Sequence, residues 1–294
     1  MDIHVLKLYK HLAASLHFGR TSRACNITPS ALTRAVQRLE AELGERLLVR
    51  DNRSVGLTPA GELFRKYADD VLLRWDELQN DLARDDELRG EISLYCSVTA
   101  VFSILPGILS RFRKDYPRVH INLSTGDAAR ALTKLFNNEA DLTIAALPEK
   151  LPPQLEFMKT IETPLVFIAP VDFKDTVVYS GKEIDWRQTP IVMAEQGLSR
   201  ERIERWFREN NILPKIYAQV AGNEAIIAMV SLGCGVGIVP KLVLDKSPLK
   251  AKVEILAQAP QLTPFTIGVC TVKKNMSNPK IKAFWEVALR EGRW

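Results

Sequence analysis

The segment Phe18–Arg50 places the strongest constraint on what this chain can fold into. It contains a short predicted helix, Thr21–Asn26, whose last residue can stop a helix, followed closely by a second helix. Thr28 is a suitable N-cap for that second helix, Pro29 suits its first position, and Gly44 suits a left-handed C-cap. Two helices joined by a tight turn predict a helix-turn-helix, the arrangement that places one helix in the DNA major groove.

The helix after the turn has one apolar and one polar side. The predicted buried side consists of Ala31, Leu32, Ala35, Val36, Leu39 and Leu43. The other side carries hydroxyl, amide and guanidinium groups, which reach base edges and phosphates. A two-stranded wing is predicted next, with its turn at Asp51 and Asn52. The predicted DNA-binding residues are Thr28, Pro29, Ser30, Thr33, Arg34, Gln37, Arg38, Arg50 and Arg53. A solvated face on a small helical bundle is the alternative interpretation.

A long helix is predicted to follow the wing. It is capped by Thr58, begins at Pro59 and runs to about Asp86, with no Pro or Gly after Gly61. An apolar stripe at helical spacing comprises Leu63, Tyr67, Val71, Trp75, Leu78 and Leu82. One stripe on so long a helix cannot be buried against a small domain alone, so we predict that it pairs two protomers. Packing within one chain is the alternative.

Charge and length bound the remaining possibilities. The first 58 residues carry nine basic and five acidic side chains, whereas residues 59–88 carry four basic and nine acidic ones. This contrast between a basic head and an acidic connector is more informative than the pI near 9.0. A length of 294 residues predicts two or three domains. The chain has no segment resembling a signal peptide or a membrane span, which predicts a cytoplasmic protein with no membrane partner.

The sequence offers few residues in patterns that are typical of a catalytic or metal site. Residues 89–294 contain one histidine, His120, so we predict no metal site and no Ser–His or Cys–His pair. The four cysteines are widely separated, which predicts free thiols. The glycine-rich GCGVG at residues 233–237 follows a predicted helix and precedes a predicted strand. A dinucleotide-binding loop needs the reverse order, so we predict no cofactor and a protein that is not an enzyme. An oxidoreductase is the competing class.

Strand and helix signals alternate through residues 89–294, which predicts doubly wound α/β sheets with right-handed crossovers. Strands are expected at 91–98, 119–124, 141–145, 165–169, 191–194, 216–220, 237–239 and 265–272. Helices are expected at 100–116 with a break after Ile104, and at 128–137, 199–210, 224–232 and 279–290. The predicted domains are 1–58 (winged helix-turn-helix), 59–88 (linker helix) and 89–294 (effector domain). Lobe I of that last domain would span about 89–161 and 267–294, and lobe II about 162–266.

Several strand-to-helix turns in this half suit a small anion. Free backbone N–H groups and the positive end of a helix dipole favour a carboxylate there. The candidate effector-binding residues are Ser97, Val98, Thr99, Thr125, Gly126, Asp127, Gln196, Gly197, Asn223 and Glu224, with Ser199 as a helix cap. Plain helix capping explains each turn alone, and their joint occurrence is what indicates a ligand cleft.

The run FGRTSRACNITPSALTRAVQRLEAELGERLLVRDNRSVGLTPAG resembles the signature of LysR-type transcriptional regulators. The resemblance implies an α/β multidomain protein with a winged helix-turn-helix, a linker helix and a two-lobed, periplasmic-binding-protein-like effector domain. It also implies double-stranded DNA with an interrupted palindromic operator, a small carboxylate effector, RNA polymerase as a partner, and homodimers that assemble into homotetramers. Ala35 departs from the family, because a Gln is frequent there and its DNA contact would be lost.

Further segments resemble one member of that family more closely, among them CSVTAVFSILPGILSRFRKDYP, EADLTIAALPEKLP and NEAIIAMVSLGCGVGIVP. That member activates a gene of branched-chain amino-acid synthesis. The resemblance implies acetolactate or acetohydroxybutyrate, small 2-hydroxy-3-keto carboxylates, as effectors. A LysR-type regulator of another pathway that senses a different small carboxylate is the alternative. An alternative of another class is a small-molecule-binding protein whose N-terminal bundle only mediates oligomerisation.

Overall fold

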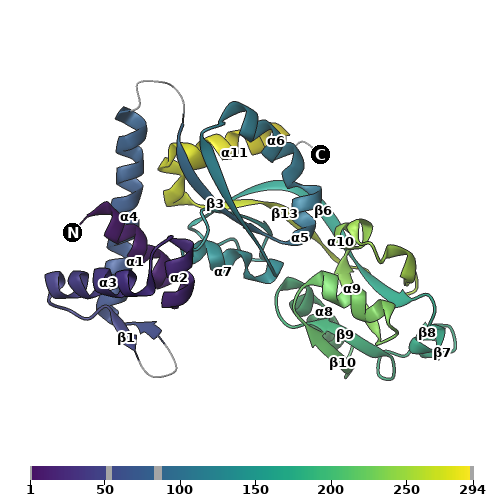
Figure 1. Cartoon of the computed structure of the whole chain (residues 1–294). Coiled ribbons are helices and arrows are strands. Elements are labelled where there is room, and N and C mark those ends of the chain that lie inside the picture. Colours follow the sequence, from purple (N-terminus) through teal and green to yellow (C-terminus); the bar gives the residue numbers. More distant parts are fainter. Residues whose placement is uncertain (1, 51–54, 83–87, 292–294) are drawn as a thin grey trace. The chain divides into compact units, whose positions relative to one another are not determined.

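The computed structural model describes residues 2–50, 55–82 and 88–291 and divides the chain into two compact units (Figure 1). Unit 1 comprises residues 1–90 with 137–139, and unit 2 comprises residues 91–136 and 140–294. Within the described part of the chain, no helix has both the length and the apolar character needed to cross a membrane.

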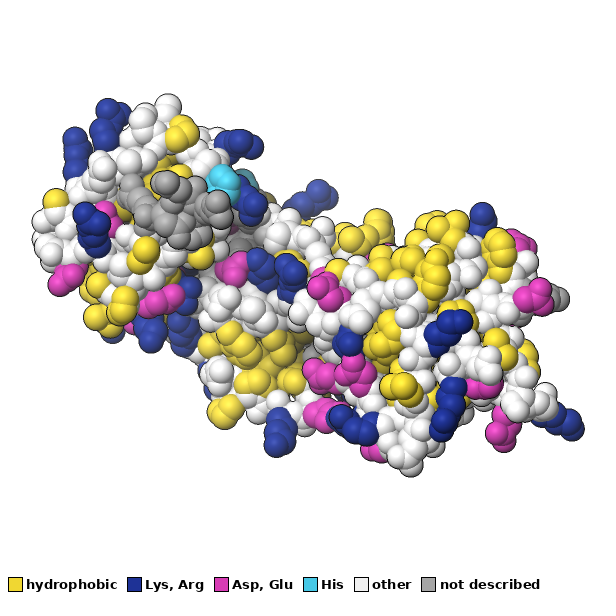
Figure 2. Space-filling view, turned by 90° about the horizontal axis from the view of Figure 1, so that it is seen from below, with side chains coloured by type: hydrophobic (Ala, Val, Ile, Leu, Met, Phe, Trp, Pro, Cys, Tyr) yellow, Lys and Arg dark blue, Asp and Glu magenta, His cyan; other side chains and the backbone are white. Residues whose placement is uncertain are grey.

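Unit 1 is a winged helix-turn-helix followed by a long helix. Its elements are α1 (Ile3–Ser15), α2 (Phe18–Ala24), α3 (Pro29–Leu43), β1 (Leu48–Arg50), β2 (Val55–Leu57) and α4 (Pro59–Leu82). The predicted signals around α3 are confirmed: Thr28 Oγ1 accepts a hydrogen bond from the N–H of Ala31 at 3.2 Å, and Gly44 has φ of 69°. In Figure 2, Lys and Arg side chains are spread over the surface of this unit.

Two details of the predicted helices are wrong. The second helix is not Thr21–Asn26 but begins at Phe18 and ends at Ala24. It starts earlier because His17 caps it, with Nδ1 accepting from the N–H of Arg20 at 3.2 Å. Leu43, expected on the buried side of α3, is 42% exposed because it lies in the last turn, beyond the apolar clusters of this unit.

Helix α4 buries a face that differs from the predicted stripe. Phe64, Ala68 and Leu72 are buried and pack with residues of α1, where the rings of Phe64 and Tyr9 meet edge-on at 5.0 Å. Tyr9 is fully buried, and its hydroxyl donates to the carbonyl of Gly61 at 2.9 Å. Burial of each such side chain contributes about 1.5–3 kcal/mol. Packing within the chain therefore accounts for one side of α4.

The predicted stripe lies on another side of α4 and is more exposed. Leu63, Tyr67 and Leu78 are 71%, 49% and 47% exposed, and Val71 and Trp75 are half-buried. The side chain of the sixth stripe residue, Leu82, is outside the described residues, as is the predicted helical stretch 83–86. Val71 packs partly against the cluster of unit 1, whereas Leu63, Tyr67 and Leu78 form a second apolar face of α4 that is exposed among the described residues.

Unit 2 contains one mixed sheet of nine strands flanked by helices. Its lobe I elements are β3 (Gly90–Cys96), α5 (Val98–Ser103), α6 (Leu105–Asp115), β4 (Val119–Thr125), a short 3₁₀ helix (Ala128–Arg130), α7 (Ala131–Phe136), β5 (Leu142–Ala146) and α11 (Pro279–Glu291). Its lobe II elements are β7 (Tyr179–Ser180), β8 (Glu183–Ile184), β9 (Pro190–Ala194), α8 (Leu198–Glu209), β10 (Lys215–Val220), α9 (Asn223–Ser231), β11 (Val236–Pro240), α10 (Lys241–Lys246) and β12 (Val253–Ile255). Both lobes share the long strands β6 (Leu155–Pro170) and β13 (Leu262–Val272).

The strand order is β10-β9-β11-β6-β13-β5-β3-β4, with β12 beside β6. β3 and β5 are parallel, as are β10, β9 and β11, whereas β6 and β13 form an antiparallel pair in the middle (Figure 1). The pairing register shifts between Ile267 and Gly268. Each lobe is therefore a parallel α/β unit, and the two are joined by a continuous ladder.

The α/β alternation is confirmed, with differences in extent. The break after Ile104 is present and separates α5 from α6. The strand predicted at 165–169 is the end of β6, which begins ten residues earlier at Leu155. Its first half escaped prediction because charged and polar residues interrupt the apolar pattern, as at Lys159 and Glu162, which form an ion pair at 2.8 Å. Elements β7, β8, β12 and α10 were also not predicted.

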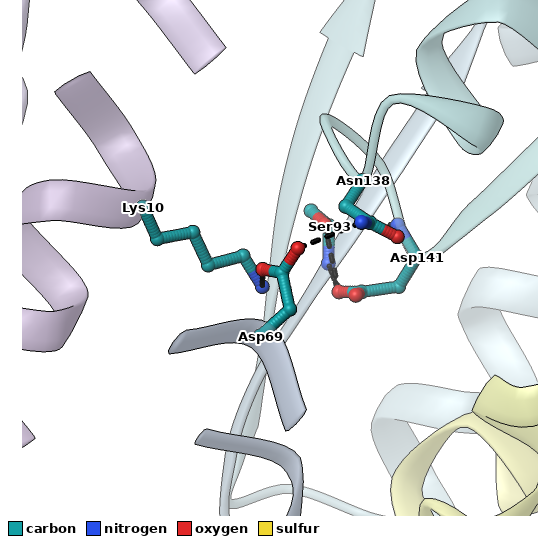
Figure 3. Close-up of polar contacts among 5 residues, drawn as sticks. All are labelled: Lys10, Asp69, Ser93, Asn138 and Asp141. Carbon is teal, nitrogen blue, oxygen red and sulfur yellow. Dashed lines mark hydrogen bonds and ion pairs between the residues drawn. The ribbon is translucent and has the colours of Figure 1, made fainter. Parts of the chain in front are cut away.

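Short hydrogen bonds fix the start of β5 against β3. Asp141 Oδ2 accepts from both the backbone N–H and the hydroxyl of Ser93, at 2.8 and 2.7 Å (Figure 3). The N–H of Asp141 is in turn 2.9 Å from the carbonyl of Ser93, and Thr271 Oγ1 donates to the carbonyl of Asp141. Because charge-assisted bonds of this kind are strong, they hold the register of β5 and with it the residues at its far end.

Gly61 tests the packing of α4 in unit 1. A Cβ added at this position would overlap the backbone oxygen of Leu47. Gly61→Ala should therefore destabilise the protein by about 1–3 kcal/mol through overpacking, although alanine is favoured over glycine in helices by about 1 kcal/mol. Calorimetric melting of the full chain measures the effect. Gly56→Ala is the control, because a Cβ there meets nothing within 4 Å; equal melting of both variants would contradict the packing.

Candidate DNA-binding helix and effector cavity

The polar side of α3 faces solvent. Thr28, Pro29, Ser30, Arg34, Gln37 and Arg38 are exposed, and Thr33 is half-buried. Some of these groups already have partners, because Thr33 Oγ1 donates to the carbonyl of Pro29 at 2.9 Å and the hydroxyls of Thr28 and Ser30 lie 3.1 Å apart. The guanidinium groups of Arg34 and Arg38 and the amide of Gln37 are thus the long polar side chains on this face of α3.

The wing is attached to α3 through a carboxylate. Glu40 Oε1 accepts from the backbone N–H of Leu47 at 2.9 Å and of Leu48 at 3.2 Å, at the start of β1. β1 and β2 then pair antiparallel, with Val49 opposite Gly56. Of the predicted wing residues, Arg53 and the side chain of Arg50 lie outside the described residues.

Ala35 lies between the two sides of α3. It is half-buried and packs against an apolar cluster that includes Leu12, Leu32 and Val36. A residue at this position therefore contacts the core on one side and the outer face of α3 on the other. With alanine, the position contributes packing and offers no polar group for DNA.

Unit 2 contains a cavity of about 230 Å³ between its lobes. Lobe I contributes Asp127, Ala128, Ala129, Leu132, Ala145, Ala146 and Pro148 to its lining. Lobe II contributes Ala194, Gln196, Gly197, Leu198, Ser199, Glu201, Val220, Gly222 and Asn223, and Phe265 of β13 completes it. The lining combines small and aliphatic side chains with a few polar groups, which is typical of small-molecule sites.

The predicted effector residues divide into two groups. Asp127, Gln196, Gly197 and Asn223 line the cavity, whereas Ser97, Val98, Thr99, Thr125, Gly126 and Glu224 lie outside its lining. The apolar wall and Glu201 were missed by sequence reasoning. The ends of β5 and β9, which supply Ala145, Ala146 and Ala194, carry a signal that could have found part of the wall, because clefts form outside the carboxyl ends of parallel strands.

Two helix N-termini open onto the cavity without a side-chain cap. The N-cap of α8 is Gly197, with φ of 91°, and the N-cap of α9 is Gly222, with φ of 86°. Ser199 is therefore not the cap that was predicted but the second residue of α8. Because a glycine cap offers no side-chain acceptor, the first N–H groups of both helices remain available to an anion.

Three contacts connect the lobes around the cavity. Thr99 Oγ1 donates to Glu224 Oε1 at 2.6 Å, and Arg205 Nη2 donates to both carboxylate oxygens of Glu149 at 2.7 and 2.8 Å. A Cβ built on Gly197 would lie 2.7 Å from the Cβ of Ala129 in the opposite lobe. These contacts define the lobe arrangement in which the cavity has its present size.

The arginines of α8 near the cavity are directed to other partners. Arg202 Nη1 donates to the carbonyls of Thr263 and Pro264, and its guanidinium lies over the ring of Phe265 at 4.5 Å. Burial lowers the pKa of Arg202. Arg200 Nη1 donates to the carbonyl of Ala194 at 3.1 Å and its Nε donates to Glu204. Neither residue belongs to the cavity lining.

The remaining candidate groups are the cysteines, possible metal ligands and the glycine-rich segment. All four cysteines are free, and burial raises the pKa of Cys96 and Cys270 to about 12. Among the residues that the structure describes, no group of three or more His, Cys, Asp or Glu could hold a metal ion. Gly233 and Gly235, both with positive φ, connect α9 to β11, which is the order that excludes a dinucleotide loop.

Comparison with known proteins defines the class. The profile of the bacterial regulatory helix-turn-helix protein, lysR family, matches residues 3–62, and that of the LysR substrate binding domain matches residues 85–293. The chain belongs to the LysR family of transcriptional regulators. It is a DNA-binding regulator with an effector-binding domain, and membership of this family places it outside the enzymes, as predicted.

Particular relatives are similar over the whole chain. The HTH-type transcriptional regulator IlvY of Escherichia coli is 47% identical over 98% of both chains. The HTH-type transcriptional activator IlvY of Haemophilus influenzae is 42% identical over 97% of this chain and 99% of its own. Among solved structures, full-length OxyR from Pseudomonas aeruginosa covers 100% of this chain and 95% of its own, at a TM-score of 0.66 and 22% identity. CbnR, a LysR family regulator, covers 100% of both chains, at 0.61 and 20%.

Proposed function

We propose that this protein is a cytoplasmic activator of a gene in branched-chain amino-acid synthesis and that it responds to acetolactate or acetohydroxybutyrate. The identity of 47% to the E. coli IlvY regulator, which extends over nearly the whole of both chains, is the observation that carries this proposal. Residues 1–58 would bind DNA, residues 59–88 would pair protomers, and residues 89–294 would bind the effector.

The outer face of α3 is the proposed DNA reader. Its exposed guanidinium groups, Arg34 and Arg38, suit phosphates and guanine edges, and the amide of Gln37 suits adenine. Full-length CbnR, a structural relative of this chain, has been solved in complex with its target DNA. In this chain, two copies joined through α4 would place two such helices on the half-sites of an interrupted palindrome. Dimers would pair again through their effector domains into a tetramer that contacts RNA polymerase.

The cavity between the lobes is the proposed effector site. Its volume of about 230 Å³ suits a small acid, and the uncapped N-termini of α8 and α9 supply N–H groups for a carboxylate. The effector-binding domain of QuiR, a 24% identical structural relative with a TM-score of 0.58, is recorded in complex with shikimate. Asp127, Gln196, Gly197 and Asn223 are the predicted effector residues that line the cavity here.

Effector binding would change how the two lobes of the effector domain are arranged relative to each other. The cavity is formed by both lobes, so a ligand that touches both binds one arrangement better than another and shifts the population toward it. The cross-lobe bonds Thr99–Glu224 and Glu149–Arg205 are made in the arrangement described above. The shift would alter the spacing of the DNA readers in the assembly, which couples effector binding to DNA binding.

Arg34 tests the DNA-reading face. Arg34→Ala should weaken binding to the protein's own promoter region by about 1–3 kcal/mol, because it removes one strong contact. Fluorescence anisotropy at several salt concentrations measures the loss, and a slope of log affinity against log salt that is smaller by about 0.9 would identify a phosphate contact. The charge-matched control is Arg290→Ala on α11, whose partner Glu286 is a loose surface pair at 3.9 Å. Unchanged affinity of Arg34→Ala would refute the role of α3.

Ligand-dependent melting tests the effector. Acetolactate should raise the melting temperature of the full chain, because a ligand that binds only the folded state stabilises it by mass action, about 2.7 kcal/mol at one hundred times its Kd. Other small carboxylates should raise it less at the same concentration. A selective shift with an unrelated acid would leave the family assignment in place and would refute the proposed pathway.

The exposed stripe of α4 tests the oligomer. Leu63→Glu places a charge at a position that is 71% exposed in the single chain and would lie inside the protomer pair. We expect dissociation toward smaller species in analytical ultracentrifugation, because an unpaired buried charge is strongly unfavourable. Leu151→Glu is the matched control on an exposed loop position. If both variants sediment like the original protein, α4 does not pair the protomers.

A further inference from the structure

We propose that the cavity selects ligands by charge: Asp127 and Glu201 restrict it to acids with a single carboxylate and accept a hydrogen bond from a hydroxyl group of the ligand. This inference rests on the proposed role of the cavity as the effector site. The two carboxylates come from opposite lobes, and no basic side chain takes part in the selection.

The charges of the lining are all of one sign. Asp127 comes from lobe I and Glu201 from the first turn of α8 in lobe II. No Lys or Arg occurs among the residues described as lining the cavity. Arg200 and Arg202, which precede and follow Glu201 on α8, are bonded to backbone carbonyls and to Glu204 instead. A ligand therefore meets two negative side chains and no positive one.

One carboxylate is nevertheless accommodated by the backbone. The N-termini of α8 and α9 end at the cavity with glycine caps, Gly197 and Gly222, and each carries roughly half a positive charge. Glu201 in the first turn of α8 and Glu224 in the first turn of α9 already offset part of this charge, so the two N-termini together can balance at most about one further negative charge. A second carboxylate on the ligand would find no such partner and would be repelled by Asp127 and Glu201. Each repulsion of this kind in a partly enclosed site lowers affinity by about tenfold.

The same two side chains offer acceptors to a neutral donor. Asp127 uses Oδ1 to accept from the N–H of Ala129 at 3.1 Å, which leaves Oδ2 for a ligand. Glu201 is exposed at the cavity. Ionised carboxylates only accept hydrogen bonds, so they favour a hydroxyl over a ketone at the same position of the ligand. Leu132, Val220 and Phe265 leave an apolar wall for a short alkyl group.

Two matched pairs of ligands separate charge from hydrogen bonding. Acetolactate and citramalate share a methyl-substituted hydroxy acid carbon, and citramalate carries a carboxymethyl group in place of the acetyl group, which adds a second carboxylate. We expect calorimetric titration of the full chain to show acetolactate binding at least about tenfold more tightly. In the second pair, 2-hydroxyisovalerate should bind more tightly than 2-oxoisovalerate.

Glu201→Gln tests whether the charge of this side chain causes the discrimination against a second carboxylate. The variant removes one charge, keeps the size and should raise citramalate affinity by about tenfold, with a smaller effect on acetolactate. Glu209→Gln, at the other end of α8 and outside the lining, is the matched control and should change neither. Asp127→Asn is a second variant that preserves the cap on Ala129 and should act in the same direction as Glu201→Gln.

The outcomes distinguish this inference from the proposed function. If the unaltered protein binds acetolactate and citramalate equally well, or if neither variant improves citramalate binding, the charge selection is refuted while the effector assignment stands. If 2-hydroxyisovalerate binds more tightly than 2-oxoisovalerate while acetolactate does not bind, the hydrogen-bond preference is supported and the effector assignment fails. Binding of none of the four acids overturns both.

Discussion

The antiparallel pairing of β6 with β13 is the constraint on which the effector half depends. The ladder runs from Leu155 opposite Val272 to Leu165 opposite Leu262, so the same two strands belong to both lobes. Its register shifts next to Gly268, where a Cβ would overlap the backbone oxygen of Met158. A continuous ladder keeps the lobes at a fixed separation, and an irregular step within it is where strands bend most easily. A second register shift lies between Leu262 and Phe265, so the central pair has two irregular steps between the lobes.

The position and chemistry of the cavity follow from that sheet. On either side of the central pair the strands are parallel, so their carboxyl ends and the N-termini of the following helices meet at one edge. Ala145 and Ala146 end β5, and Ala194 ends β9, which gives the cavity small walls where larger side chains would fill it. The glycine caps of α8 and α9 then leave backbone donors uncovered. The site thus takes its positive character from the backbone and its negative character from two side chains.

Local signals made the DNA-binding half predictable, and long-range pairing made the effector half less so. Thr28, Pro29 and Gly44 act within a few residues of themselves, and each has the predicted role in the structure. Gln196 and Asn223 could be placed near the cavity because each follows a strand and precedes a helix. Thr99 and Glu224 were selected by the same rule, yet they bond to each other across 125 positions of sequence, a pairing that no local pattern contains. Glu201 was missed because an acidic residue in the first turn of a helix is ordinary capping chemistry.

Helix α4 shows why one periodic pattern can describe two surfaces. The stripe that begins at Leu63 and the buried face that begins at Phe64 are offset by one residue, which is about 100° around a helix. Both recur at spacings of three or four residues, so the sequence alone does not tell which of the two faces packs against the chain's own core. The buried face packs with α1, so intramolecular packing and protomer pairing are not exclusive interpretations of this helix. Among the described residues, Leu63, Tyr67 and Leu78 leave apolar area of α4 exposed, and this area supplies a hydrophobic driving force that a second copy of the same helix can satisfy.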